Sequence, residues 1–572
     1  MYRPAALFLS LVMTPVAASS QDRSQARSLV ISQRGIAATS QTLASQAGAQ
    51  IMARGGNAVD AAIAANAALA VVEPMMNGIG GDLFVIVRDG KTGKLSGLNA
   101  SGHAPQGLTR EFLSKTGAYG MPQAGIHSVT VPGCVDGWER LHKKFGRLAW
   151  ADLFQPAIYY ARNGFPVTEW TQGSWDGARS KLMADENARR IYLRDGQPPK
   201  VGEVWKLPEM ARALELIASQ GAAAFYKGAI AQSILKTSRR LGGVMSAADL
   251  AEFQSEWVEP VSTKYRGWDV YELPPNSQGM AALEMLNIME RFAISKWDAL
   301  STEALHHKIE AQKLAYADLQ RYLGDPRAVS IPVRELISKP YAEKRARLID
   351  PERAVCNVNP GQPIPGAGDT IYLTTVDKDG TVVSLIQSLY LSFGSGVVVD
   401  DFGFHLHNRG ALFTLEEGHP NDLQPRRRPF HTIIPGYMEK DGMHVGFGIM
   451  GGLNQAQAHA QFVSYVADHG DNIQMALERP RFTKLNFSGC DVMLEARVSE
   501  STREGLRTRG HFLQMQGDFS SWMGGGQAVL HDSKAKVNYG ASSPRKDGAA
   551  VPEPDPYFGS PGLTMAKPTG AR

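Results

Sequence analysis

Apolar residues recur at helical spacing through the first part of the chain. Over residues 40–52 they fall on one face of a helix, and the run ends in Arg54-Gly55-Gly56, a typical helix C-terminus. Asn57-Ala58-Val59-Asp60 then opens an alanine-rich run that continues to Val72 and stops at Pro74. The pattern predicts two consecutive helices, and the small side chains of the second suit close packing against a sheet.

Further helical patterns alternate with loops in the middle of the chain, and strand patterns dominate after residue 369. Helices are predicted over 136–145, 150–163, 208–220 and 278–294, and again over 455–469 and 473–477. Strand patterns flank tight turns at 377–380 and 439–442. A chain of 572 residues exceeds one typical core, so we expect either two domains or one large layered domain.

A threonine stands where a loop meets one of these strands. Residues 357–367 are rich in proline and glycine, and the strand pattern begins at Thr370 with β-branched and aromatic residues. If the loop were cut before Thr370, the new N-terminal residue would carry both a nucleophilic hydroxyl and an α-amine that accepts its proton. The alternative is an ordinary first residue of a strand, because threonine is common in strands.

The turn at 377–380 brings the next strand back towards Thr370. Depending on the length of the turn, Thr370 lies opposite Gln387, Leu389 or Ser388. Only a three-residue loop with a bulge places Ser388 opposite, because a slip of one residue turns a side chain to the other face. In that register the Ser388 hydroxyl would donate a hydrogen bond to the nucleophile; otherwise Ser388 is a serine at the edge of the core.

A second glycine pattern predicts an oxyanion site. In the run 446–455 a strand ends in Gly451-Gly452 and a helix then begins. Backbone N–H groups at a helix N-terminus suit a developing negative charge, and glycine lets a substrate approach the backbone. A plain strand-to-helix turn is the alternative.

Other chemistries lack their motifs. The run Asn77-Gly78-Ile79-Gly80-Gly81-Asp82 is not followed by the lysine of a P-loop, and neither Gly-x-Ser-x-Gly nor His-Glu-x-x-His occurs. The close histidine pairs, His306-His307 and His405-Leu406-His407, have no obvious carboxylate partner in the sequence. We therefore predict no metal and no cofactor.

Composition fits an exported soluble protein. A net charge of +4 and a content of 20% charged residues give no basis for nucleic-acid binding, since the one dense basic run, 426–428, is short. Residues 1–20 have the pattern of a signal peptide, so we expect a periplasmic or secreted protein with no membrane span.

Three scattered cysteines exclude a disulfide scaffold. A single disulfide bridge remains an alternative but is not expected. Beyond Ser542 prolines accumulate, and the tail, 551–572 in particular, is predicted to be disordered.

Taken in order, several motifs make residues 30–550 resemble the γ-glutamyltransferase (glutathione hydrolase) family of N-terminal-nucleophile hydrolases. The motifs that carry the resemblance are Gly55-Gly56-Asn57-Ala58-Val59-Asp60-Ala61-Ala62, Gly78-Ile79-Gly80-Gly81-Asp82, Val131-Pro132-Gly133, Pro274-Pro275-Asn276-Ser277-Gln278-Gly279, Gly368-Asp369-Thr370, Phe393-Gly394-Ser395-Gly396, Arg428-Pro429, Gly451-Gly452 and Gly540-Ala541-Ser542-Ser543-Pro544-Arg545. The resemblance implies an α/β fold, a four-layer αββα sandwich that cuts itself into two associated subunits. It implies a large subunit over 21–369 and a small subunit over 370–550, with the cut between Asp369 and Thr370. It also implies that Thr370 is the nucleophile, that Gly451 and Gly452 form the oxyanion hole, and that Ser388 replaces a second threonine.

The substrate pocket departs from the family pattern. The position of the arginine that clamps the glutamyl carboxylate aligns with Ser101, and the acidic positions that hold the α-ammonium align with Arg409 and Leu412. The remaining substrate-binding positions align with Tyr390, Asn408, His431 and Thr432. Because an arginine repels an ammonium group and favours a carboxylate, the acyl donor is expected to lack an α-amine.

These patterns predict an amidohydrolase or acyltransferase that works through an acyl-enzyme on Thr370. Its donors would be γ-glutamyl compounds such as glutathione, or alternatively glutaryl and other dicarboxylic monoamides, as in the cephalosporin-acylase-like and oxamate-hydrolase-like branches. Its acceptor would be water, an amino acid or a peptide. A catalytically silent periplasmic binding homologue is a further alternative.

Overall fold

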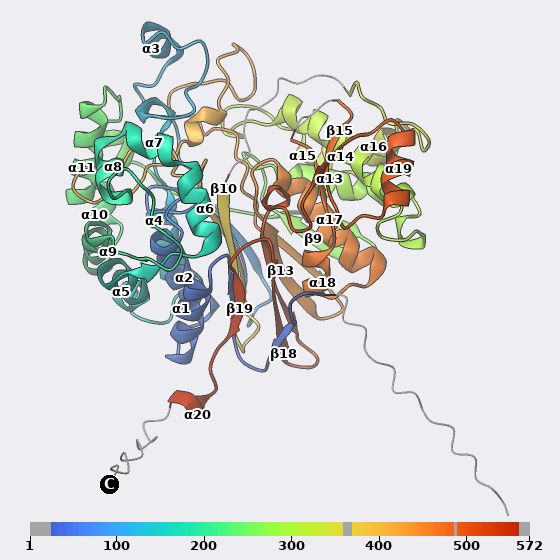
Figure 1. Cartoon of the computed structure of the whole chain (residues 1–572), viewed down its shortest axis with the longest axis horizontal. Coiled ribbons are helices and arrows are strands. Elements are labelled where there is room, and N and C mark those ends of the chain that lie inside the picture. Colours follow the sequence, from blue (N-terminus) through green and yellow to red (C-terminus); the bar gives the residue numbers. More distant parts are fainter. Residues whose placement is uncertain (1–24, 359–368, 486–488, 560–572) are drawn as a thin grey trace, which may run out of the picture.

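Two seven-stranded sheets lie face to face between two layers of helices in the computed structural model, which describes residues 25–358, 369–485 and 489–559 (Figure 1). In pairing order, the first sheet contains β19 (Ala549–Pro552), β2 (Ile36–Thr39), β10 (Asp369–Val376), β11 (Val382–Tyr390), β3 (Asp82–Arg88), β4 (Leu95–Ala100) and β7 (Glu256–Val258). The second contains β1 (Val30–Ser32), β18 (Val537–Ser542), β17 (Gly526–Asp532), β13 (Met443–Ile449), β12 (Gly436–Lys440), β9 (Trp268–Glu272) and β8 (Val261–Tyr265). The expected αββα sandwich is confirmed.

Alternation along the strands assigns each residue to a layer. On β10, Ile371 and Leu373 face the helices, whereas Tyr372 and Val376 lie between the sheets. Two glycines of β13 let the second sheet approach this face. A Cβ at Gly448 would lie 2.4 Å from the Tyr372 ring. A Cβ at Gly446 would lie 2.7 Å from the hydroxyl of Thr374.

The predicted pair of helices covers the first sheet as α1 (Thr42–Ala53) and α2 (Ala58–Val72). Every residue of α2 is buried, because its small side chains pack against the sheet on one side and other helices on the other. Asn57 and Asp60 form a capping box at its N-terminus. The outer helices on this side are α4 (Cys134–Phe145), α5 (Gln155–Asn163), α9 (Pro208–Gln220), α10 (Ala223–Tyr226) and α11 (Ala229–Arg240).

The opposite layer of helices covers the second sheet. Its members are α13 (Gly279–Met289), α14 (Thr302–Tyr322), α16 (Lys339–Ala346), α17 (Asn454–His469), α18 (Ile473–Glu478) and α19 (Glu500–Thr508). The structure contains helices in the predicted ranges, with two corrections. The helix expected over 150–163 is a 3-10 turn (Trp150–Phe154) followed by α5, which has a proline in its first turn, where no N–H is needed. The helix expected to reach residue 294 ends at Met289.

Both sheets combine strands from before and after Thr370, so residues 25–559 build one layered unit rather than two domains. The prediction of disorder beyond Ser542 is wrong in part. Ala549–Pro552 forms the edge strand β19, where Pro552 is tolerated because an edge strand pairs on one side only, and Pro556–Gly559 is a short helix, α20. Residues 560–572 and the predicted signal peptide lie outside the described ranges.

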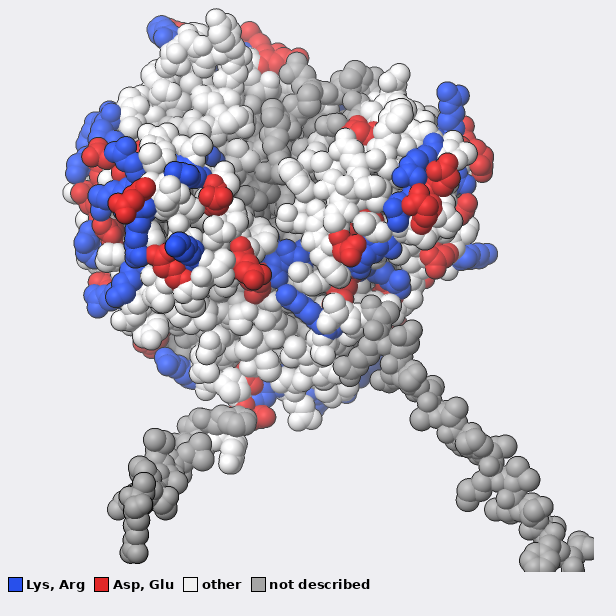
Figure 2. All heavy atoms as spheres, viewed as in Figure 1, with Lys and Arg blue, Asp and Glu red and all other residues white. Residues whose placement is uncertain are grey.

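Charged side chains are mixed over the surface. On the face shown in Figure 2, acidic and basic residues are interspersed, and neither sign forms an extended patch among the described residues. Within those ranges, no helix combines the length and the apolar character that crossing a bilayer requires.

Candidate active site

The hairpin of β10 and β11 adopts the register that places Ser388 opposite Thr370. Ile371 pairs with Gln387, and the Asp377 N–H donates to the Thr381 carbonyl at 3.1 Å, which closes a three-residue loop. Gly380, the last residue of that loop, has φ +80°, a left-handed conformation that favours glycine. The register shifts between Asp369 and Ile371, so Thr370 lies at a bulge.

The hydroxyl groups of Thr370 and Ser388 are hydrogen-bonded to each other. Thr370 Oγ1 donates to Ser388 Oγ at 3.2 Å, and the Tyr390 N–H donates to the same oxygen at 2.7 Å. The direction corrects the expectation that Ser388 donates to Thr370. Both side chains are buried, so Ser388 fixes the rotamer of the candidate nucleophile.

Gly451 and Gly452 connect the end of β13 to the start of α17. Their φ angles of +118° and +60° are accessible to glycine at little cost. Both carbonyl groups accept hydrogen bonds from the first turn of α17, namely from Asn454 and Gln455. Among the described residues, neither N–H of the two glycines donates to a protein acceptor, as an oxyanion site requires.

An ion pair that the sequence did not indicate lies beside this pair of hydroxyls. Asp82 is the neighbour of Ser388 across β3 and β11, and Arg409 Nε donates to its carboxylate at 2.8 Å. Arg409 Nη1 donates to the Thr432 hydroxyl at 2.9 Å. Both ions are fully buried. The carboxylate that Arg409 binds is therefore Asp82 of the protein, which corrects the expectation that Arg409 is a free site for a substrate carboxylate.

Two histidines complete the surroundings of Asp82. Burial alone would raise the pKa of Asp82, but Arg409, His431 and His407 hold it well below its ordinary value. Burial and the Arg409 charge lower the pKa of His431 to about 4, so this ring is neutral near pH 7. The sequence signal for Asp82 is weak: it ends a family motif and is an acidic residue at the start of β3, ahead of a run of five apolar residues.

The other predicted substrate-binding residues are tied to the protein frame. Ser101 Oγ accepts from Asn276 Nδ2 at 3.0 Å, at the end of β4. Asn408 Nδ2 donates to the Gln123 carbonyl at 2.7 Å. The Tyr390 ring lies under the Arg409 guanidinium, 4.9 Å from its centroid. Burial raises the pKa of Tyr390 to about 12, although Arg409 partly opposes the shift.

Lys546 is a second residue that sequence reasoning missed. Its ammonium donates to the backbone carbonyl of Thr370 at 3.3 Å and lies 3.8 Å from the centroid of the Trp170 ring. Lys546 is almost fully buried. The only signal in the sequence is its place directly after Arg545, the last residue of a family motif.

A cavity of about 1410 Å³ is lined in part by residues that follow Arg409, while Thr370, Ser388, Gly451 and Gly452 are not among its lining residues. Ala411 and Leu412 contribute to its wall from the 3-10 helix η4 (Arg409–Leu412), which also carries Arg409. Other parts of the wall combine apolar and aromatic residues, such as Leu314, Tyr322, Val355 and Val358, with charged ones, such as Glu310, Asp318, Arg345 and Glu416. The cavity is large enough to hold a small amide together with a bulky amine group.

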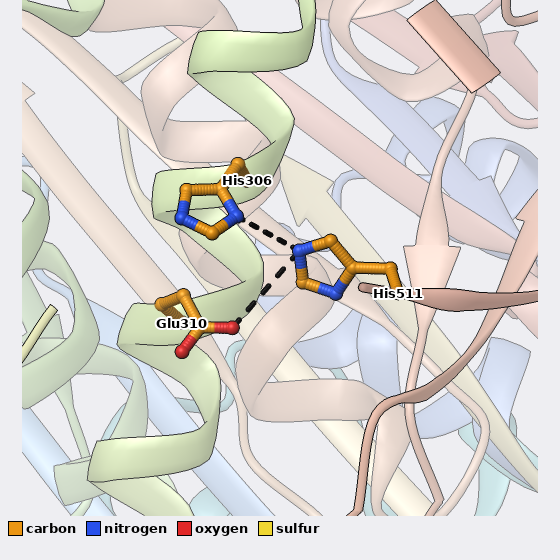
Figure 3. Close-up of side chains that lie close together, drawn as sticks. All are labelled: His306, Glu310 and His511. Atoms are coloured by element: carbon orange, nitrogen blue, oxygen red, sulfur yellow. Dashed lines mark hydrogen bonds and ion pairs between the residues drawn. The ribbon is translucent and has the colours of Figure 1, made fainter. Parts of the chain in front are cut away.

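Three side chains elsewhere lie close enough to suggest a metal, but hydrogen bonds explain their arrangement (Figure 3). Burial lowers the pKa of His306 to about 4 and that of His511 to about 3, so both rings are neutral at pH 7. His306 Nε2 lies 2.8 Å from the Asp350 carbonyl and donates to it, so Nδ1 accepts from His511 Nε2 at 2.8 Å. Glu310 is paired with Lys313 at 2.6 Å. Both nitrogens of His306 and Nε2 of His511 take part in these hydrogen bonds, and the Lys313 ammonium lies beside Glu310. The cluster therefore does not fit a metal ion.

The sequence model of the family described as gamma-glutamyltranspeptidase matches residues 44–553. The chain belongs to this family. The glutathione hydrolase-like YwrD proenzyme of Bacillus subtilis is 38% identical over 514 residues, which cover 89% of this chain and 96% of that protein. The oxamate amidohydrolase proenzyme of Klebsiella pneumoniae is 33% identical, over 91% of this chain and 99% of that protein.

Among solved structures, the cephalosporin acylase from Bacillus halodurans superposes with a TM-score of 0.87 at 39% identity, covering 95% of this chain and 99% of that one. A member of the γ-glutamyltranspeptidase family with this similarity shares the N-terminal-nucleophile fold. The names of these relatives range from glutathione hydrolase to acylase, so the substrate of this chain has to be inferred from its own site.

Proposed function

We propose that this protein is a self-processing amidohydrolase or acyltransferase whose nucleophile is the N-terminal Thr370 of a small subunit. The observation that carries the proposal is the hydrogen bond of 3.2 Å between the hydroxyl groups of Thr370, at the start of β10, and Ser388. Relatives of this chain are named as proenzymes, which supports self-processing. The cut falls between Asp369 and Thr370 and yields a large subunit over 21–369 and a small subunit whose catalytic part covers 370–550 and which keeps residues 551–572 as its tail.

Processing and turnover use the same oxygen atom. In the precursor, Thr370 Oγ1 attacks the Asp369 carbonyl carbon, the peptide C–N bond breaks as the α-amine leaves with a proton, and water hydrolyses the resulting ester. In the mature enzyme the α-amine takes the hydroxyl proton while the oxygen attacks a substrate amide. The leaving amine departs with that proton, and water or an amine acceptor takes the acyl group. Gly451 and Gly452 N–H groups stabilise the oxyanion at each stage.

Two classes of acyl donor are supported by different observations. A glutathione hydrolase-like relative supports γ-glutamyl amides. The two positions that align with the family's ammonium-binding acids support a donor without an α-amine, because Leu412 offers no acceptor for an ammonium group and Arg409 is a cation that already binds Asp82. We favour glutaryl and other dicarboxylic monoamides on that ground.

Two measurements test these statements. On a denaturing gel run with reductant, wild type should show bands near about 38 and about 22 kDa, at about 110 Da per residue, and Thr370→Ala a single band. A single unprocessed band for wild type and Thr370→Ala alike would refute processing and support a silent binding homologue. Initial rates on glutaryl- and γ-glutamyl-p-nitroanilide then separate the donors; a strong preference for the γ-glutamyl compound would exclude our choice.

Export to the periplasm or the medium is part of the proposal. The pattern of residues 1–20 supports it, and so does a disulfide between Cys356 and Cys490, since disulfides persist in oxidising compartments. That bridge was not expected from the sequence. We propose a small-molecule amide as the ligand, with neither nucleic acid nor membrane as a partner.

A further inference from the structure

The disulfide spans the bond that is proposed to be cut. Cys356 precedes Thr370 and Cys490 follows it, and the third cysteine, Cys134, is buried and free. Resting on the proposed cleavage, we propose that the mature enzyme is a covalently linked heterodimer, with its large and small subunits joined through Cys356 and Cys490. None of the family features named above implies this link.

The backbone around the disulfide is paired across the same subunit boundary. The Gly489 N–H donates to the Cys356 carbonyl at 2.8 Å, and the Ala354 N–H donates to the Arg509 carbonyl at 2.7 Å. Cys490 is only 2% exposed, so the bond is protected from dissolved reductants on the side of the small subunit. These contacts hold the two cysteines together before cleavage and after it.

The buried cluster of Figure 3 anchors the same segment from the other side. Glu310 Oε2 accepts from the Val355 N–H at 3.1 Å, and Lys313 Nζ donates to the Val355 carbonyl at 3.1 Å. Lys313 Nζ also lies 3.8 Å from Cys490 Sγ. The Glu310–Lys313 pair therefore binds both the N–H and the carbonyl group of Val355, the residue next to Cys356. This gives the buried pair a structural role.

The tether has a consequence for the cavity. Val355 and Val358 line it, and both lie in the last described segment of the large subunit before the cut. Once the chain is cut, this segment leads to a free C-terminus. The covalent bond at Cys356 keeps it on the small subunit, opposite Leu412, and so preserves the wall of the cavity.

Formation of the bond requires an oxidant. The two thiols lose two protons and two electrons to a protein or small-molecule disulfide of the export compartment, which becomes a dithiol. The cysteine pair is therefore expected to be oxidised in exported protein, before or after cleavage.

Denaturing gels with and without reductant test the tether. Exported wild-type protein, purified without reductant and alkylated, should run as one species near the sum of both subunits without reductant, and as two bands with it. Cys490→Ser should give two bands on both gels. Cys134→Ser, which removes a buried thiol outside the bond, should behave as wild type.

Each outcome separates the tether from the proposed function. Two wild-type bands on both gels would overturn the tether and leave processing standing. One wild-type band on both gels would remove the cleavage and the heterodimer together. Proteolysis of alkylated, unreduced wild type should also release a linked pair of peptides containing Cys356 and Cys490, detected by mass; both peptides alkylated and separate would overturn the proposal even if a variant fails to fold.

Discussion

Replacement of Arg409 by methionine should destabilise the protein through Asp82. Methionine keeps much of the side-chain length but removes the charge, so a fully buried carboxylate loses the cation that lies 2.8 Å from it. In the wild-type protein the neighbouring His431 ring is neutral at pH 7, because burial and the Arg409 charge lower its pKa to about 4. The change leaves an uncompensated charge in the interior.

The size of the effect follows from the burial of both ions. With charge centres about 4 Å apart and an effective dielectric constant of about 20, their attraction is about 4 kcal/mol. Removal of one partner from a buried pair typically costs about 3–5 kcal/mol of stability. Arg409→Met should therefore lower the free energy of unfolding by about that amount at pH 7.5. The double variant Asp82→Asn/Arg409→Met should recover most of it, because no buried charge remains.

The pH dependence of stability is an independent test, because its direction should differ between the two proteins. In wild type the pKa of Asp82 is lowered, so its contribution is present above the unfolded pKa, about 3.9, and is lost as pH falls through the folded value. Without Arg409, burial raises the folded pKa above the unfolded one. The unfolded state then ionises first as pH rises, and the variant loses stability with increasing pH from about 4 upward. The gap between the two proteins should be smaller at pH 4.5 than at pH 7.5.

Urea unfolding followed by tryptophan fluorescence measures these differences. All proteins carry Thr370→Ala, so that each sample is a single uncut chain, and midpoint and slope are fitted together. A difference below about 1 kcal/mol at pH 7.5 would refute the view of Asp82 and Arg409 as a compensated buried pair. No recovery in the double variant would show that the loss comes from packing instead.

Three further substitutions probe the catalytic parts. Ser388→Ala should lower kcat on p-nitroanilides by about tenfold or more with little change in KM, because its hydroxyl oxygen accepts hydrogen bonds from Thr370 Oγ1 and from the Tyr390 N–H; a change in KM alone would contradict this role. Gly451→Ala should lower kcat by about 100-fold or more, since alanine is strained at φ +118° and the change in backbone would displace an oxyanion donor. A kcat near that of wild type would exclude Gly451 from the oxyanion hole. Lys546→Met should raise the pKa of the Thr370 α-amine and move the acid limb of kcat/KM upward by about 1–2 pH units, whereas Lys546→Arg should not; an unshifted pH profile would limit Lys546 to packing.

Local patterns placed the candidate nucleophile and its hydroxyl partner near each other, whereas their proposed roles came from the family resemblance. Thr370 and Ser388 belong to one hairpin, so turn length and strand period narrowed their pairing to three registers, and Gly380 decides between them. Gly451 and Gly452 were equally visible, because a strand-to-helix turn is a local feature. The four-layer sandwich, by contrast, was implied by the family resemblance.

Partners far apart in sequence were not visible in this way. Asp82 and Arg409 lie 327 residues apart, and Cys356 and Cys490 lie 134 apart. No periodicity relates such pairs. Asp82 and Arg409 meet because β3 pairs with β11 and the segment before η4 is bonded to both, through the His407 N–H to the Gly80 carbonyl and the Asn408 N–H to the Leu389 carbonyl. Arg409 was correctly expected to seek a carboxylate, but the packing supplies it from the protein itself.

The topology explains how a cut at Thr370 is compatible with a stable enzyme. Cleavage removes a covalent bond at the very start of β10, before the regular pairs of Ile371 to Val376 with β11, so the strand keeps its ladder on both sides. Each sheet contains strands from both products, and separating the subunits would open both sheets and expose their shared cores. The proposed cut would therefore create an α-amine where the hydroxyl, Ser388 and Lys546 are already in place, and the Cys356–Cys490 bond would hold the segment around Cys356 on the small subunit.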